Sequence, residues 1–557
     1  MNSPPSFSLL TQPWIPCVMV DGRNELLSIR DIFDGRHDVA VIRGDSPAQD
    51  YAVLRVLLAI YWRAHHAETH VSAGGTFIFS DWFGRTAENL GQPDDLVGNY
   101  LDDYADRFDL LHPQLPFMQV ADLHTEKDTR LPVQRIVPEA EGHYFTMRAG
   151  RARESLDFAE AARWLIYTQA YDYSGIKSGA VGDERVKGGR GFPIGTGWTG
   201  RTGGTVVVGD NLRETLLLNT TLEALADVTD RPVWEREPDT AAERHIPPPT
   251  GAGESAMPQG PSDLATWQGR RIRLFTESGK VTEVLVTNGD RIPDAGANVL
   301  GDPMTPYRYS KNKSKKDLPV HYALPLDPNR TMWKSLEPLI SLDRDPGFDG
   351  KNVAPQRPKN LSQLAVLAEK RVVRPVLNVQ MVSVDYGPQD SSVATTVTSH
   401  LDIPLALLEP EAGDMRADVI DVASSTLQAA IALGQFAGNL LEAAGRLYEF
   451  QADPTDAILT ELEPEFSRWL RSFEADRFEE QAGTWQKQLR EIILERAAEM
   501  MRGAGPKALV GREISDGRDG ANTKILSAGS AHRMLQARLK KMLTYIDDEE
   551  PDKETNR

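Results

Sequence analysis

Cysteine is nearly absent: Cys17 is the only one among 557 residues. One thiol cannot form a disulfide within the chain, and a zinc finger built on thiolates needs several. The chain also lacks an apolar run of the roughly 20 residues that cross a bilayer. Its opening, MNSPPSFSLLTQPWIP, has neither the basic region nor the long apolar run of a signal peptide. These absences predict a cytoplasmic protein without a membrane partner.

Signatures of catalysis are also scarce. No GxSxG nucleophile elbow occurs, and the segment most similar to a phosphate-binding loop is Gly195–Thr202, GTGWTGRT. That loop needs a buried strand before it and a helix after it, whereas here KGGRGFP precedes and the β-forming TVVVG follows. Arg also cannot replace the compact ammonium of the loop's Lys. We therefore predict no catalytic residues, with a nucleotide-binding enzyme that uses this loop as the alternative.

Four potential metal ligands, His65, His66, Glu68 and His70, follow an apolar helical segment. Imidazoles and carboxylates bind zinc and iron, but this spacing matches neither HExxH nor a known variant. We expect a solvated helix end here, with no metal and no cofactor.

Positive charge is scarce relative to negative charge, since 62 Lys and Arg stand against 81 Asp and Glu, giving a net charge of −19. Proteins that coat nucleic acid concentrate Lys and Arg on their surface. Any contact with nucleic acid is therefore expected to be local. Basic side chains gather in three segments, each of which alone is typical of a solvated loop: Arg148, Arg151 and Arg153; Lys177, Arg185, Lys187 and Arg190; and Lys311, Lys313, Lys315 and Lys316.

The periodicity of apolar residues predicts an α+β fold of two domains. Residues 1–402 are expected to form a large mixed α/β domain, with a helix at 52–66 and a hairpin at 270–289. Residues 403–546 carry four apolar stripes at helical spacing, which predict a four-helix bundle.

Three segments have the composition of irregular structure. Residues 186–204 and 238–263 are rich in residues that form turns, and we expect loops there. The tail at 547–557, DDEEPDKETNR, is charged and nearly free of large apolar side chains, which predicts disorder.

Three separated motifs occur along the first region: LTQPWIP at 10–16, HPQLPFMQ at 112–119 and GGTVVVGDNLRETLLLN at 203–219. A β-rich stretch, a turn at Tyr386-Gly387 and the helical region follow them. In this order they resemble the CasA family, the large subunit of the type I-E CRISPR Cascade surveillance complex. The resemblance covers nearly the whole chain.

The resemblance implies a non-catalytic subunit that recognises the protospacer-adjacent motif (PAM) in double-stranded DNA and helps open the duplex. The implied partners are double-stranded DNA, guide RNA, the other Cascade subunits and a helicase-nuclease effector that degrades the DNA. A pure assembly scaffold without DNA contact is a second alternative.

The resemblance also implies site residues. The glycine loop that enters the minor groove corresponds to Gly175, Ile176, Lys177, Ser178 and Gly179. The lysine finger corresponds to Lys316, with Lys315 and Lys313 as alternatives. The wedge falls on Gln389, Asp390 and Ser391; simple register selects Asp390, but an acidic wedge repels phosphate and Gln389 is adjacent. A loop toward the guide RNA and a neighbouring subunit contains Phe145 and Arg148.

Overall fold

The computed structural model describes residues 5–70, 76–141, 150, 154–244, 257–298, 301–315, 320–324, 326–327, 331–349, 352–368, 373–516 and 522–546. The chain divides into two compact units. Met1–Leu326 and Val353–His400 form the first, and Asp327–Asn352 and Leu401–Arg557 form the second. Helices and sheets mix in the first unit while long helices dominate the second, so the expected α+β class is confirmed.

Helix α2 (Pro47–His65) runs through the middle of the first unit, and most of its residues are buried. The Ser46 hydroxyl accepts a hydrogen bond from the Gln49 amide, and Pro47 occupies the first turn, which are both typical of a helix start. Helices α4 (Asp95–Asp103), α7 (Phe158–Tyr171) and α11 (Pro261–Ala265) pack against it. The helix expected at 52–66 is thereby confirmed.

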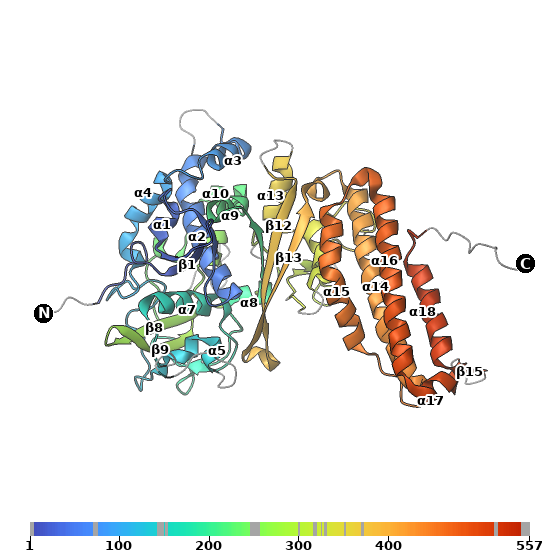
Figure 1. Cartoon of the computed structure of the whole chain (residues 1–557). Coiled ribbons are helices and arrows are strands. Elements are labelled where there is room, and N and C mark those ends of the chain that lie inside the picture. Colours follow the sequence, from blue (N-terminus) through green and yellow to red (C-terminus); the bar gives the residue numbers. More distant parts are fainter. Residues whose placement is uncertain are drawn as a thin grey trace, which may run out of the picture. The chain divides into compact units, whose positions relative to one another are not determined.

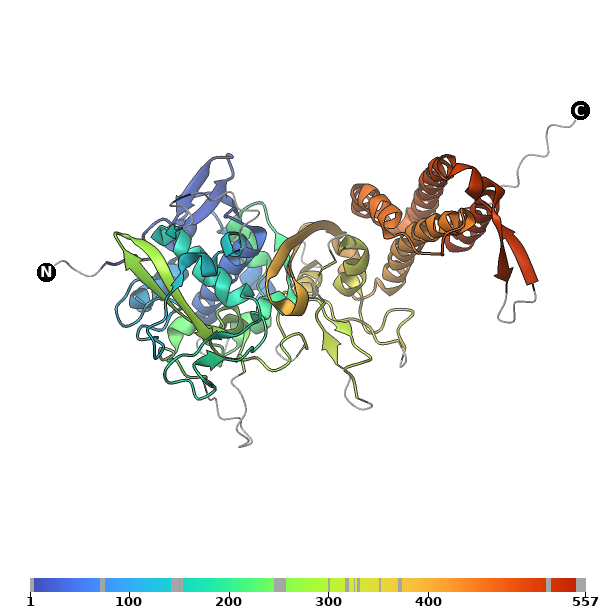
Figure 2. The ribbon, with the colours of Figure 1, turned by 90° about the horizontal axis from the view of Figure 1, so that it is seen from below.

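Three antiparallel sheets complete the frame of this unit. The strands β1 (Ile15–Met19), β2 (Asn24–Leu27) and β3 (Val39–Ile42) are ordered β2-β1-β3. The expected hairpin is β8 (Arg270–Glu277) and β9 (Lys280–Asn288), the long green pair in Figure 2, with β4 (Leu131–Pro132) on its edge. In the third sheet, β7 (Gly204–Val208) pairs with β12 (Val376–Tyr386), which is followed by β13 (Val393–Pro404).

Short elements connect these layers. The helices are α1 (Ile29–Phe33), α3 (Phe79–Glu88), α5 (Pro138–Glu141), α8 (Trp198–Thr202), α9 (Leu212–Leu218), α10 (Leu222–Ala226) and α13 (Lys359–Ala368). The strands are β5 (Lys177–Ser178), β6 (Arg190–Gly191), β10 (Arg308–Tyr309) and β11 (His321–Tyr322), which form two small hairpins.

The second unit is built around α14 (Gly413–Ala443). Helices α15 (Ala452–Arg471), α16 (Phe478–Gly503) and α18 (Ala528–Met542) pack along it (Figure 1), and α17 (Gly505–Val510) touches its end. These helices coincide with the four predicted stripes. The hairpin of β14 (Arg512–Asp516) and β15 (Asn522–Leu526) was not predicted.

Segment Asp327–Asn352 belongs to the second unit, although the sequence analysis assigned it to the first domain. Its helix α12 (Thr331–Ile340) packs on α14, and the Trp333 ring lies 4.8 Å from that of Phe466. The Arg416 guanidinium also forms a buried ion pair with Asp345 at 2.5 Å. The C-terminal part of the unit begins at Leu401, two residues before the proposed boundary. The tail at 547–557 lies outside the described residues.

Helix α14 is long and apolar enough to cross a membrane by length and composition, which the sequence analysis did not anticipate. Most of its apolar stretch is nevertheless buried against the neighbouring helices. Such burial is typical of the core helix of a helical unit, whose apolar face contacts protein instead of lipid.

Candidate nucleic-acid interface

The glycine loop at 175–179 begins where α7 ends. After Asp172 the chain turns and enters β5, which pairs with β6 through Lys177 opposite Gly191 and Ser178 opposite Arg190. Gly175 has φ +156°, and a Cβ there would make only ordinary contacts. A Cβ on Gly179 would lie 2.5 Å from the Val186 side chain, so this glycine is required by packing.

Lys177 points into the protein, toward the buried carboxylate of Asp172. Its Nζ lies 3.2 Å from that carboxylate, donates to the Tyr173 carbonyl at 3.0 Å and sits 4.2 Å from the Tyr173 ring centroid. The Asp172 carboxylate also accepts hydrogen bonds from Arg135 at 2.7 Å and Arg270 at 2.5 Å. This buried cluster of one carboxylate and three cations anchors the glycine loop, so Ile176, which is 57% exposed, is the side chain the loop presents.

The charges of this cluster are strongly coupled. Burial alone would raise the pKa of Asp172, but Arg135, Arg270 and Lys177 outweigh burial and hold it well below its usual value. Burial lowers the pKa of Lys177 to about 8 in spite of the attraction of Asp172. Because each charge depends on the others for compensation, the loss of one member is expected to expose the rest to an unfavourable environment.

The predicted wedge residues form the turn between β12 and β13. Gln389 and Asp390 both have positive φ, at 60° and 54°, and the Gly387 amide closes the turn on the Ser392 carbonyl at 2.9 Å. The Ser391 hydroxyl donates to the Pro388 carbonyl at 2.8 Å. This geometry makes the turn a tight, well-bonded tip of the long hairpin.

The two wedge candidates differ in their surroundings. The Asp390 carboxylate accepts a hydrogen bond from Arg201 at 2.5 Å, so its charge is paired. Gln389 is exposed, and its side-chain amide has no hydrogen-bond partner among the described residues. Of the two, Gln389 is therefore the side chain that is free to contact another molecule.

The wedge turn and the glycine loop are directly connected. The Ser174 amide donates to the Asp390 carbonyl at 2.8 Å, and the Tyr386 hydroxyl donates to the Tyr171 carbonyl at 2.8 Å. Tyr386 also fills the space over Gly200, where a Cβ would lie 2.0 Å from its hydroxyl. Tyr171 and Tyr386 are 215 residues apart in the sequence. The segments that contain them thus lie side by side and form one surface.

The predicted lysine finger lies on the loop between β10 and β11. Lys313 sits 3.9 Å from the Tyr322 ring centroid and 3.5 Å from Asp294, while Lys315 is exposed. The Ser314 hydroxyl accepts from the Val320 amide at 2.8 Å and narrows the loop. Lys316 lies outside the described residues, as do Phe145 and Arg148 of the loop assigned to guide RNA.

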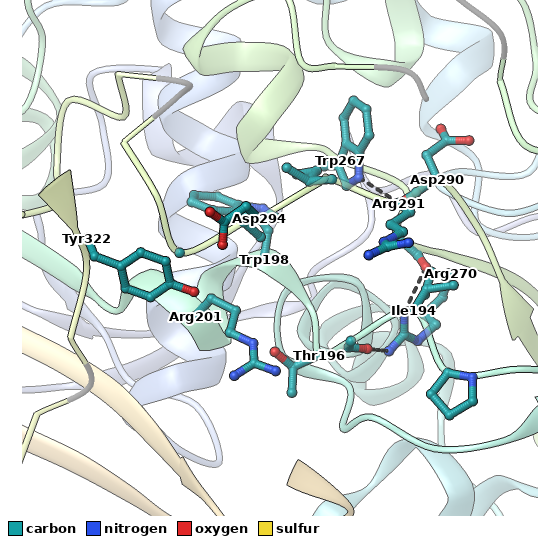
Figure 3. A pocket seen from close by; sticks show the side chains of 16 residues that line it. Ile194, Thr196, Trp198, Arg201, Trp267, Arg270, Asp290, Arg291, Asp294 and Tyr322 are labelled. Atoms are coloured by element: carbon teal, nitrogen blue, oxygen red, sulfur yellow. Dashed lines mark hydrogen bonds between the residues drawn. The ribbon is translucent and has the colours of Figure 1, made fainter. Parts of the chain in front are cut away.

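A cavity of about 330 Å³ lies among these segments (Figure 3). Its lining includes Arg201, which binds the wedge turn, Tyr322, which follows the lysine loop, and Arg270, which anchors the glycine loop. Thr196 and Arg291 also line it. The cavity is therefore lined by residues that contact or follow the three segments that the resemblance assigns to DNA, although no residue of those segments lines it.

Segment Gly195–Thr202 does not have the architecture of a phosphate-binding loop. Trp198–Thr202 form the single-turn helix α8, and strand β7 follows this helix, whereas in such a loop the strand precedes the helix. A Cβ on Gly197 would lie 2.3 Å from the Ala170 carbonyl oxygen, so the segment is packed directly on α7.

The expectation of a solvated helix end at His65 is wrong. The two ring nitrogens of His65 lie 3.1 Å from Glu68 and 3.1 Å from Asp94, and the side chain is buried. Trp82 donates to the same Glu68 carboxylate at 2.6 Å. Asp94, which is 29 residues from His65, is brought to it only by the fold. His65 thus belongs to a buried polar network.

Sequence reasoning gave no role at the candidate interface to two residues that line the cavity. Arg201 was considered only as part of a phosphate-loop motif, yet it contacts Asp390, 189 residues further on. Arg291 gave no signal at all, because it is an isolated Arg after a strand. A motif could not have found either of them, since what they share is a cavity and not a spacing.

These features define a large α+β protein of two units, whose candidate site among the described residues consists of surface loops around a cavity. The family model of the CRISPR-associated protein Cse1 matches residues 8–496. The chain therefore belongs to the CRISPR-associated Cse1 family.

Three relatives document this similarity. A CasA/Cse1 protein of Thermus thermophilus is 32% identical over 286 residues, and the alignment spans about half of each chain, 50% of this one and 51% of the relative. The crystal structure of Thermobifida fusca Cse1 is 34% identical with a TM-score of 0.80, covering 98% of this chain and 100% of that one. A chain of a CRISPR RNA-guided surveillance complex is 19% identical with a TM-score of 0.60, covering 96% and 100%, and shares the fold.

Proposed function

We propose that this protein is the non-catalytic large subunit of a type I-E Cascade complex, which recognises the PAM in double-stranded DNA and helps to open the duplex. The observation that carries this proposal is the hydrogen bond from the amide of Ser174, the residue directly before the glycine loop, to the Asp390 carbonyl of the wedge turn at 2.8 Å. A segment that recognises a duplex and a segment that separates it must act at adjacent base pairs. The direct bond supplies that proximity.

Recognition is assigned to the glycine loop. The minor groove is only about 6 Å wide, so a segment that enters it must present backbone and small side chains. Gly175 meets this condition because it has no side chain, and the position of its absent Cβ is not tightly packed against other protein atoms. Lys177 supports the loop from inside through Asp172, so its ammonium acts as an anchor in this conformation. Ile176 adds an exposed apolar contact.

Strand separation is assigned to Gln389. A wedge must leave the protein surface and enter between base pairs, and Gln389 is exposed at the hydrogen-bonded tip of the hairpin. The neighbouring Asp390 would repel phosphate, but its pairing with Arg201 reduces this repulsion. The alternative register, in which Asp390 is the wedge, would require that ion pair to break.

The lysine finger is assigned to the loop between β10 and β11. Lys315 is exposed, and Lys316 follows it directly in the sequence. Lys313 is held near Asp294 and Tyr322, which makes it a support of this loop. A lysine in the minor groove binds base edges or phosphates as a compact cation.

The remaining partners follow from the family. The surveillance-complex chain that shares this fold favours assembly with guide RNA and the other Cascade subunits, with Phe145 and Arg148 in the contacting loop. A helicase-nuclease would supply catalysis, and base pairing with the guide would supply specificity for the target, as in other RNA-guided systems. Such a complex acts in the cytoplasm, where invading DNA is met.

The recognition step is tested with the assembled complex and a duplex that bears the motif. Gly175→Asp adds bulk and negative charge to the loop and should weaken capture of this duplex, while guide-RNA assembly persists. Gly22→Asp is the matched control, because Gly22 also has positive φ, at 87°, and open space around it. Gly179→Asp is less informative, because any Cβ there meets Val186. Unchanged capture by the Gly175 variant would contradict the proposal.

The opening step is followed separately with a fluorescent base next to the motif. Gln389→Ala should leave capture intact and slow the rise of fluorescence, because the wedge acts after recognition. Gln92→Ala, the same change at an exposed glutamine outside the assigned segments, serves as the control. If both variants open the duplex at the rate of the unaltered protein, the role of a wedge does not belong to Gln389. A scaffold without DNA contact would show no capture at all.

A further inference from the structure

The cavity next to the wedge turn has the properties of a binding site, and the roles proposed for the glycine loop, the lysine loop and the wedge turn do not use it. We propose that it binds one nucleotide of a single strand, with Arg291 and Thr196 holding the phosphate and Tyr322 contacting the sugar or base. This inference rests on the proposed function, since strand separation at the wedge would supply such a strand. The cavity lies entirely within the first unit.

Thr196 offers a hydrogen-bonding group to a ligand in this cavity. The side chain is only 8% exposed, and its hydroxyl has no hydrogen-bond partner among the described residues. A buried hydroxyl without a partner costs free energy, so such groups are rare unless something else satisfies them. Because Thr196 lines the cavity, a ligand atom placed there could accept or donate this hydrogen bond (Figure 3).

The charges of the lining favour an anion. Arg270 is compensated by Asp172 at 2.5 Å, and Asp290 is compensated by Arg271 at 2.7 Å and Arg244 at 2.5 Å. Asp294 has Lys313 at 3.5 Å. Each of these carboxylates thus already has a cation.

Arg291 is different, because its guanidinium has no ion-pair or hydrogen-bond partner within the described part of the chain. Its backbone amide donates to Glu243 at 3.2 Å, while the carboxylate of Glu243 pairs with Arg185 at 3.1 Å. An unpaired guanidinium on a cavity wall matches the fork geometry of phosphate oxygens. It supplies the uncompensated positive charge of the cavity.

The size and the aromatic lining limit the ligand to one nucleotide. A volume of about 330 Å³ lies near the lower end of small-molecule sites, which excludes paired bases. The half-buried Tyr322 ring stands at the wall (Figure 3), and aromatic rings are the usual platforms for unpaired bases. Trp198 and Trp267, which also line the cavity, are buried and belong to one hydrophobic cluster with Leu264 and Ile292.

Arg201 connects the cavity to the wedge. It lines the cavity and binds the Asp390 carboxylate on the hairpin turn. A nucleotide in the cavity would bring a second anion within reach of the same guanidinium. Occupation of the cavity and the position of the wedge turn are therefore expected to influence each other through this one residue.

The experiment uses the full chain and a short single-stranded DNA that carries a photoreactive iodouracil. Crosslinking followed by peptide mapping should locate the strand at the peptide that contains Tyr322. Arg291→Ala should weaken the affinity for this strand about tenfold, the loss expected for one charged hydrogen bond. Thr196→Val, which keeps the shape of the side chain, should weaken it by a smaller factor. Arg36→Ala, a change at an exposed arginine distant in sequence, should have no effect.

The probes distinguish the possible ligands. Free adenosine monophosphate carries the same phosphate and tests whether the cavity takes a soluble nucleotide instead of a strand. Tight binding of the monophosphate with no binding of the strand would overturn the proposal. Crosslinks that map only outside the cavity, or full affinity in both the Arg291 and Thr196 variants, would overturn it as well.

The proposed function and the cavity fail in different ways. If Gly175→Asp captures motif duplex normally, the recognition proposal fails, while crosslinking to Tyr322 still reports on the cavity. If Arg291→Ala binds the single strand normally but Gly175→Asp loses duplex capture, the cavity proposal fails and recognition stands.

Discussion

The two units of the protein use charge in opposite ways. In the first unit the strongest ion pairs are buried, as in Arg55 with Asp302 at 2.7 Å and Arg270 with Asp172 at 2.5 Å. In the second unit most of the described pairs are exposed, such as Arg496 with Glu499 on α16. Long helices bury apolar stripes against one another, so their core needs no charged side chains. The irregular segments of the first unit are instead held in place by buried ion pairs.

The exception in the second unit supports this difference. Arg416 and Asp345 form a fully buried pair, and Arg416 also donates to the carbonyls of Leu407 and Glu409. Leu407 lies in the short 3-10 helix Leu405–Leu408 and Glu409 directly follows it, so both carbonyls belong to the segment before α14 and not to one of the long helices. Buried guanidinium groups thus occur in both units where the chain lacks regular hydrogen bonding and its carbonyls need donors.

The largest effect is expected from Asp172→Asn. The change leaves Arg135, Arg270 and Lys177 buried without their shared anion, which should destabilise the first unit by about 3–5 kcal/mol. Hydrogen exchange measured by mass spectrometry on the full chain reports on each unit separately. Glu499→Gln, which removes one of the two surface partners of Arg496, is the control and should leave exchange in the second unit unchanged. Equal effects of the two changes would contradict the comparison.

The second unit should instead be sensitive to close packing. A Cβ on Gly434 of α14 would lie 2.4 Å from the Gln451 carbonyl oxygen and 2.4 Å from the Thr455 hydroxyl. Gly434→Ala is therefore expected to cost about 1–3 kcal/mol, despite the better helix propensity of Ala. Gly503→Ala in α16 is the matched control, since no atom lies within 4 Å of its Cβ position. Denaturant unfolding measures both; a Gly434 variant as stable as the Gly503 variant would show that α14 and α15 can separate freely.

The difference between the units also explains what the sequence could predict. The hairpin at 270–289, the helix at 52–66 and the C-terminal helices follow from local periodicity, which survives without knowledge of the fold. The hairpin of β14 and β15 was missed because its strands, REISD and NTKIL, contain few β-formers. They also lack a clear alternation of apolar and polar residues, and helices precede and follow them.

The site was predictable by segment but not by contact. The resemblance selected segments for the candidate site, which remain predictions. It could not tell that Lys177 points inward, because the compensating Asp172 cluster needs Arg270, 98 residues beyond Asp172. It also left Gln389 and Asp390 as alternatives, which only the pairing of Asp390 with Arg201 separates. Tertiary ion pairs have no spacing that a sequence displays.

A smaller and pH-dependent effect is expected at His65. Burial alone would lower its pKa, but hydrogen bonds with Asp94 and Glu68 outweigh burial and raise it above the usual 6.5. The pKa of each of these two carboxyls is lowered. At Asp94, burial opposes the lowering of the pKa, but the hydrogen bond with His65 outweighs burial. At Glu68, the hydrogen bond with His65 is the main cause of the lowered pKa. The stabilisation by His65 is therefore complete below pH 6.5 and is lost as the pH rises through its raised pKa.

The measurement is the urea midpoint of the full chain across this range, with His65→Gln as the variant. The unaltered protein should lose stability with rising pH, and the variant should show a flatter profile. The carboxyls set the acid limit, because their contribution is lost as the pH falls through their lowered pKa values. Exchange in the second unit should not follow this profile, since the network lies wholly in the first unit. A slope unchanged in the variant would contradict the assignment.

The smallest effect is expected at the pair of Arg201 and Asp390. This pair lies in the first unit but is not buried, so it tests whether burial alone makes an ion pair strong. Both side chains are about one-third exposed, so water screens the pair although it belongs to the unit with the buried network. Asp390→Asn, Arg201→Gln and the double variant form a cycle whose coupling in urea unfolding should stay within about 1 kcal/mol. Asn tolerates the positive φ of 54° at this position as well as Asp does, so the backbone of the turn does not confound the result. A coupling near that of a buried pair would mean that the wedge turn is held as rigidly as the glycine loop. The charge of Asp390 would then stabilise the fold and would not be available for contact with DNA.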